Sequence, residues 1–163
     1  MIRLLFVVVF MVLALPASAG DREVLVGTWR YAGEVDTLGD GSAGPTSALS
    51  DTQGLLVYTR DGFVSVVLMP KNRNWRAETA TIGELRETVV NGNAYAGRYE
   101  LDPDTHTITH VTSVSMEPAY QEKRLDRKYS LEGNTLILRG TFPYEGQTVH
   151  FTITWIRASA NDD

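Results

Sequence analysis

The sequence contains no cysteine. This absence excludes disulfide bonds, metal sites built on thiolates, and a lipid-modified N-terminal cysteine. The chain also has no stripe of basic residues, and its formal net charge is −5. The long-range attraction that underlies binding to nucleic acid or to an anionic membrane surface is therefore missing. We expect a small molecule or another protein as partner, and no nucleic acid.

Several catalytic motifs are absent as well. No Gly-x-Ser-x-Gly nucleophile motif occurs, and the glycines around Gly39-Asp40-Gly41 precede no expected helix that could cradle a phosphate. His106 and His110 could share a metal ion in a helix. In a strand, however, that spacing separates them by about 13 Å. The sequence therefore predicts no metal site and no cofactor, and it identifies no catalytic residue.

The longest apolar run, Leu4–Leu15, lies at the N-terminus behind Arg3 and ends at Pro16. The small residues Ala17-Ser18-Ala19 follow, which is the pattern after which signal peptidase cleaves. As a helix the run would span about 18 Å, too short for the roughly 30 Å hydrocarbon core. We therefore expect residues 1–19 to be a signal peptide. Residues 20–163 would form one mature domain with no membrane anchor, periplasmic or secreted, with a net charge that falls to −6 once Arg3 is removed.

Past this segment, short β-rich runs alternate with turn signals, a pattern typical of a β-sandwich or β-barrel. Asp61-Gly62 and Glu132-Gly133-Asn134 are among the turns. The pattern predicts about eight strands with short links: Val26–Val35, Leu55–Thr59, Phe63–Met69, Ala94–Leu101, Thr107–Met116, Lys123–Leu131, Thr135–Arg139 and Thr148–Arg157.

One helix is predicted, from Ile82 to Val90. Thr81 and Glu84 fit a capping box, and Ile82, Leu85 and Val89 fall on one helical face. We expect this helix to cover one opening or flank of the domain. The segment Thr37–Ser50, rich in Gly, Ser and Asp, predicts a long loop.

Alternation along the strands places apolar residues on one face, with polar residues among them. Arg127 shares its face with Leu125 and Tyr129, and His110 lies between Ile108 and Val114. Tyrosines and polar groups on these inward faces favour a lined cavity over a dry core. An eight-stranded antiparallel barrel can hold one small ligand, although the pattern alone leaves a sandwich open.

Several motifs resemble the bacterial lipocalin-like domain family of calycin barrels. Leu25-Val26-Gly27-Thr28-Trp29-Arg30 is similar to the Gly-x-Trp opening of lipocalins. The similarity continues, in order and spacing, through the segments 54–62, 66–69, 94–99, 109–111 and 127–136. It departs after Pro118, where Tyr120 supplies the aromatic residue of the family but no glycine follows. The resemblance implies an all-β, eight-stranded up-and-down barrel around a cavity, and it does not imply one function.

The resemblance and the strand faces together suggest roles for individual residues. Trp29 is expected to close one end of the barrel beneath an arginine, either Arg157 or Arg127. Under the alternative in which Arg127 serves a ligand, it pairs with a carboxylate or enolate oxygen, and His110 donates a hydrogen bond or moves a proton. The full set of expected ligand-binding residues is Tyr58, Tyr95, Tyr99, His110, Met116, Arg127 and Tyr129.

Three functions fit these expectations. The first is the binding of a small apolar or amphipathic molecule in a barrel cavity. The second is a cofactor-free isomerase or cyclase acting on such a molecule, so whether the protein is an enzyme stays open. The third is a protein-binding or inhibitory module that uses the loop Thr37–Ser50.

Overall fold

The computed structural model describes residues 18–45 and 51–159. The expected signal peptide up to residue 17, part of the expected loop (46–50) and the last four residues lie outside the described residues. The elements in chain order are α1 (Ser18–Leu25), β1 (Gly27–Leu38), β2 (Thr52–Tyr58), β3 (Phe63–Pro70), α2 (Ile82–Val90), β4 (Asn93–Asp102), β5 (Thr107–Ser115), the 3₁₀ turn η2 (Pro118–Tyr120), β6 (Arg124–Glu132), β7 (Thr135–Tyr144) and β8 (Gln147–Arg157).

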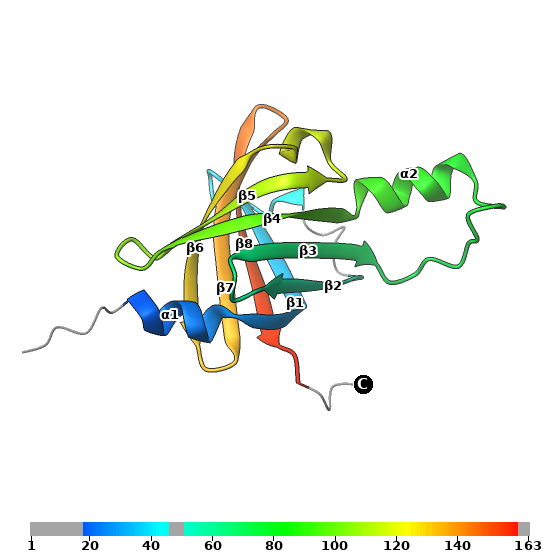
Figure 1. Cartoon of the computed structure of the whole chain (residues 1–163). Helices are drawn as coiled ribbons and strands as arrows, with labels where there is room; N and C mark the ends of the chain where they lie inside the picture. The colour runs from blue at the N-terminus through cyan, green and yellow to red at the C-terminus, as the bar shows by residue number, and fades with distance from the viewer. Residues whose placement is uncertain (1–17, 46–50, 160–163) are drawn as a thin grey trace, which may run out of the picture.

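The eight strands form a closed antiparallel barrel in sequence order (Figure 1). Each strand pairs with the next, and β8 returns to pair with β1 from Trp29↔Arg157 to Leu38↔Val149. The ring of strand pairs is continuous, although β1 and β2, and likewise β6 and β7, pair over only part of their length. The predicted up-and-down barrel is therefore confirmed, and the sandwich alternative is excluded. Among the described residues, no helix has the length and apolar character needed to cross a membrane.

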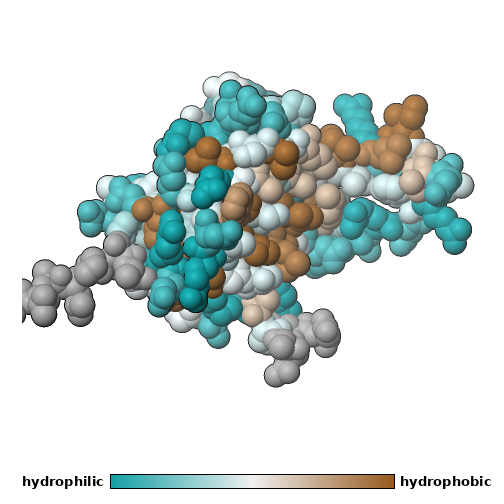
Figure 2. All heavy atoms as spheres, in the orientation of Figure 1, coloured by the Kyte–Doolittle hydropathy of each residue, from teal (hydrophilic) through white to brown (hydrophobic). Residues whose placement is uncertain are grey.

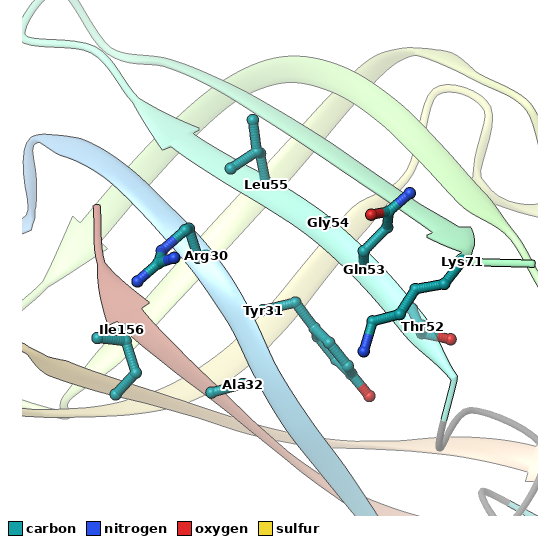
Figure 3. Close-up of a pocket in the computed structure, with 9 residues that line it drawn as sticks. All are labelled: Arg30, Tyr31, Ala32, Thr52, Gln53, Gly54, Leu55, Lys71 and Ile156. Carbon is teal, nitrogen blue, oxygen red and sulfur yellow. The ribbon is translucent and has the colours of Figure 1, made fainter. Parts of the chain in front are cut away.

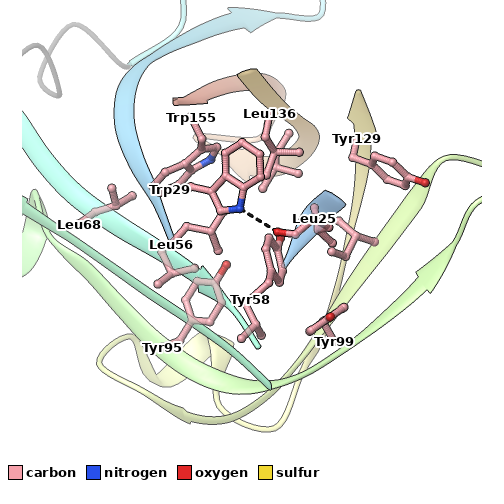
Figure 4. Close-up of a cluster of buried hydrophobic side chains, with 14 residues drawn as sticks. Leu25, Trp29, Leu56, Tyr58, Leu68, Tyr95, Tyr99, Tyr129, Leu136 and Trp155 are labelled. Carbon is pink, nitrogen blue, oxygen red and sulfur yellow. Dashed lines mark hydrogen bonds between the residues drawn. The ribbon is translucent and has the colours of Figure 1, made fainter. Parts of the chain in front are cut away.

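A packed cluster of buried side chains fills the barrel interior and reaches from Leu25 and Trp29 to Tyr95 and Leu68 (Figure 4). We call the end that holds Leu25, Trp29 and Tyr129 the closed end. Trp29 has no exposed surface, and its indole Nε1 donates to the Leu25 carbonyl at 2.9 Å. Leu25, 1% exposed, comes from α1, a second helix that the sequence did not predict. Because α1 places Leu25 in the core and joins directly to β1, it closes this end of the barrel.

Two β-bulges break the alternation of inward and outward residues. In β1 the register to β8 skips Ala32, next to Gly33, whose φ of 147° favours glycine. In β5 the register to β4 skips Ser113. Val114, expected on the inward face with His110, is consequently 61% exposed. Simple period-two alternation fails past each bulge, because one extra residue reverses the face.

Helix α2 forms where predicted and carries the predicted capping box, with the Glu84 amide donating to Thr81 and the Glu84 carboxylate accepting from the Thr81 amide. Its placement differs from the expectation. The helix projects from the barrel (Figure 1), has no buried residue, and exposes apolar side chains (Figure 2). Only its last residues, Val89 and Val90, reach the barrel opening.

Candidate functional site

The end of the barrel opposite Trp29 holds a cavity of about 440 Å³. This volume falls within the usual range for small-molecule sites. Residues from β1, β3, β4, β6, β7 and β8 line it, together with η2 and the end of α2. The apolar part of the lining consists mainly of Leu68, Val89, Phe142, Phe151 and Ile153.

Arg127 on β6 supplies the positive charge of this cavity. Its guanidinium carbon lies 5.5 Å from the centre of the Phe151 ring, a cation–π arrangement. The guanidinium also lies close enough to the Tyr95 hydroxyl to oppose the rise in the pKa of that phenol. Within the described part of the chain, Arg124 and Glu100 form a salt bridge, whereas no described carboxylate lies within salt-bridge distance of Arg127. The Tyr95 hydroxyl takes part of its hydrogen-bonding capacity, and its remaining donors are held by no described salt bridge.

Acidic groups on β1 face the same space. Glu34 lines the cavity, and burial followed by the nearby Asp36 raises its pKa to about 7, while Arg127 lowers it in part. Asp36 is 7% exposed, and its Oδ1 has no hydrogen-bond partner among the described residues. A carboxyl group whose pKa is raised in this way can hold its proton near neutral pH, and the protonated form can donate a hydrogen bond as well as accept one.

Beneath Arg127, a buried network joins two tyrosines through His110. The Tyr58 hydroxyl lies 2.6 Å from His110 Nε2, and the Tyr95 hydroxyl lies 2.8 Å from Nδ1. Burial, with a smaller contribution from Arg127, holds the pKa of His110 well below its usual value. A neutral imidazole has one donor and one acceptor nitrogen, so one tyrosine donates to the ring and the other accepts from it. Both ring nitrogens of His110 therefore have hydrogen-bond partners within the protein.

The structure places the expected ligand-binding residues in three different settings. Arg127 lines the cavity, and Tyr95, His110 and Tyr58 lie below it as described. Tyr99 and Tyr129 belong to the closed end, where Tyr99 donates to the Thr59 carbonyl and Tyr129 donates to Asp21 Oδ2 at 2.7 Å. Met116 lies past the bulge in β5 and lines a groove on the outer face. The structure thus brings Arg127, Tyr95 and His110 together and leaves Met116 apart.

Of the two arginines considered for the closed end, Arg157 is the one that covers Trp29. Its guanidinium carbon lies 4.1 Å from the centre of the indole, and the group also donates to the carbonyls of Val26 and Val24. A side chain at Gly27 would come within 2.8 Å of this guanidinium, and the φ of Gly27 is 139°. Position 27 therefore requires glycine, because a larger side chain there would collide with the guanidinium of Arg157.

A family model described as a lipocalin-like domain matches residues 26–158, which is most of the sequence. The chain belongs to the lipocalin-like domain family. A solved structure of the siderocalin Ex-FABP is similar to this chain, with 9% sequence identity and a TM-score of 0.32. The similarity covers 83% of this chain and 74% of that chain. That protein is described as functioning through dual ligand specificities. The comparison with curated proteins returned no match. Fold, family and cavity are those of a ligand-binding barrel.

Sequence reasoning missed Glu34, Asp36 and Tyr120 as site residues. Strict alternation through β1 would put Glu34 and Tyr31 on opposite faces. The bulge at Ala32 turns Glu34 inward instead, and the signal that could have revealed it was Gly33, because a glycine inside a strand often marks a bulge. Tyr120 belongs to η2, in the loop where the chain departs from the family pattern.

A second hollow, of about 590 Å³, lies between β1 and β2 (Figure 3). These strands pair only from Gly27↔Tyr58 to Arg30↔Leu55. Beyond that point, the side chains of Tyr31 and Lys71 extend into the space between the strands (Figure 3). This hollow shares no lining residue with the cavity around Arg127.

Proposed function

We propose that this protein binds one small apolar or amphipathic molecule in the 440 Å³ cavity, with Arg127 holding the polar end of the ligand. The observation that carries this proposal is that Arg127 is the cation of a lining that combines an apolar wall with the acids Glu34 and Glu117. Arg127 is half-buried and forms no salt bridge with a described carboxylate, so a ligand anion could pair with it by charge-assisted hydrogen bonds. Phe142, Phe151 and Ile153 supply apolar surface for the rest of the ligand.

The geometry favours a binding protein over the isomerase or cyclase alternative. His110 was the residue expected to move a proton, but its ring has no exposed surface and lines no part of the cavity. Both ring nitrogens are bonded to tyrosine hydroxyls. A proton could reach a ligand from this ring only through Tyr95 or Tyr58, whose pKa values burial raises.

We also propose that the protein acts outside the cytoplasm, on the basis of its N-terminal sequence. The support is the apolar run ending in Ala17-Ser18-Ala19. Cleavage after Ala19 would retain Asp21 and Leu25, which contact the closed end of the barrel. N-terminal sequencing of protein from the native host should begin at Gly20, and a chain that still begins at Met1 would contradict export with cleavage.

The binding proposal is tested with N-phenyl-1-naphthylamine, a neutral apolar dye whose fluorescence rises in apolar surroundings. We expect saturable binding with one site per chain. The variant Ile153→Trp should block it by filling the cavity, whereas Val35→Trp, on the outer face of β1 and 65% exposed, should not. Binding that survives Ile153→Trp in a folded variant, or no binding to the wild type, would reject the cavity as the site. Native mass spectrometry of protein from its own host would then identify the natural ligand.

A further inference from the structure

The cavity around Arg127 continues through the wall of the barrel between β6 and β7. A groove of about 580 Å³ on this side shares four lining residues with the cavity: Tyr120, Arg127, Phe142 and Phe151. The ladder between the strands runs only from Lys128↔Arg139 to Glu132↔Thr135. Above it, β7 continues to Tyr144 in contact with β8 alone, so the two strands separate next to Arg127. We call this opening the β6–β7 groove.

The groove is positively charged, although the chain as a whole is acidic. Lys123, Arg124, Lys128 and Arg139 line it together with Arg127, against a single acid, Asp126. The Arg124 guanidinium donates to both carboxylate oxygens of Glu100, at 3.1 and 2.6 Å, and that pair is locally neutral. Lys128 lies near Asp102 and Arg127 lies near Glu34. Lys123 and Arg139 form no salt bridge with a described acid, so the groove keeps an excess of positive charge.

Two of these cations stand directly opposite each other at the base of the groove. Lys128 and Arg139 form a cross-strand pair, an arrangement that is destabilising for like charges. Lys128 Nζ donates to Thr105 and Thr107, and Arg139 donates to Ser130, all neutral acceptors. An anion bound next to both side chains would reduce the repulsion between them. The pair of like charges therefore favours an anionic ligand at the base of the groove.

We propose that the β6–β7 groove is the entry route of the ligand, and that the ligand is an amphiphile with one acidic group. This inference rests on the proposed binding function and names the class of ligand. The cations of the groove attract the acid group from solution. The group then moves inward to Arg127, while the apolar part of the ligand follows along the stacked rings of Phe142 and Phe151, which line both the groove and the cavity.

The test compares two dyes of similar apolar structure. 1-Anilinonaphthalene-8-sulfonate carries an acid group, and N-phenyl-1-naphthylamine lacks it. Association rates are measured by stopped-flow fluorescence for the wild type and for Lys123→Glu/Arg139→Glu. The matched control, Arg60→Glu/Arg76→Glu, changes the net charge by the same amount at exposed positions that do not line the groove.

At low ionic strength we expect the groove variant to associate with the sulfonate dye about tenfold more slowly than the wild type. The control should change the rate far less, and high salt should remove the difference. The neutral dye should associate equally fast with all three proteins. A second groove variant, Lys123→Gln/Arg139→Gln, should show a smaller effect of the same kind, and it keeps the test valid if the charge reversal prevents folding.

The outcomes separate the two proposals. If neither dye binds the wild type, the binding function fails. If both dyes bind but the groove and control variants slow the sulfonate dye equally, the function stands and the entry route is wrong. Equal slowing of the neutral dye by the groove variant would also overturn the route, because it would show a structural effect in place of an electrostatic one.

Discussion

Replacing His110 by leucine should destabilise the protein strongly, and removing its two tyrosine partners as well should restore most of the loss. In the wild type, the ring nitrogens bond to Tyr58 and Tyr95 at 2.6 and 2.8 Å, and the imidazole has no exposed surface. His110→Leu leaves two buried hydroxyls without their partner. Each unsatisfied group costs about 1–3 kcal/mol, so we expect a loss of about 2–6 kcal/mol.

The triple variant Tyr58→Phe/His110→Leu/Tyr95→Phe removes every polar atom of the network. Replacing both partners of a buried hydrogen bond by apolar groups of similar shape is nearly neutral, so the triple variant should be more stable than His110→Leu alone. Urea denaturation at pH 7, followed by tryptophan fluorescence, measures both. A loss below about 0.5 kcal/mol for His110→Leu, or a triple variant less stable than the single one, would refute the reasoning.

Three further predictions concern stability. Leu25→Ala should lower the free energy of unfolding by about 2–5 kcal/mol, because this side chain at the closed end is only 1% exposed. The control Val24→Ala, at a 47% exposed position, should have little effect in the same thermal melts. Arg139→Glu should raise the free energy of unfolding by about 0.2–1 kcal/mol in urea denaturation, since it replaces the like-charge pair with Lys128 by an attractive one. The stabilisation from protonated Glu34 should be complete below its ordinary pKa of 4.5 and lost as the pH rises through about 7. The free energy of unfolding of the wild type should therefore be higher at pH 5 than at pH 8, and Glu34→Gln should reduce that difference.

Much of the fold could be predicted from local signals in the sequence. Turn residues such as Asp61-Gly62 lie at the strand ends, and the capping box at Thr81 marks the start of α2. Barrel closure could be suggested only by family resemblance, because pairing between β1 and β8 joins residues more than a hundred positions apart. The helix α1 was missed because its residues overlap the end of the expected signal peptide, and its amphipathic pattern is short.

The candidate site was predictable only in part, and the reason lies in the bulges. Arg127 follows strict alternation in β6 and could be assigned to the interior from sequence. Glu34 reaches the same cavity only because the bulge at Ala32 reverses the face of β1, and Met116 is diverted to an outer groove past the bulge in β5. A bulge inserts one residue without changing composition, so its effect on side-chain direction is invisible to periodicity.

The bulge at Ala32 and the partial pairing of β6 with β7 account for the more open half of this barrel. Below Ala32, β1 pairs with both β2 and β8, and its inward residue Trp29 packs in the closed core. Above it, β1 follows β8 alone and turns acidic side chains into the interior. On the opposite side, β6 and β7 part above the Lys128↔Arg139 pair, where Arg127 faces inward. Glu34 and Arg127 therefore enter the interior where β1 and β6 have each lost one neighbouring strand, and charged side chains are costlier to pack there than the apolar groups around Trp29.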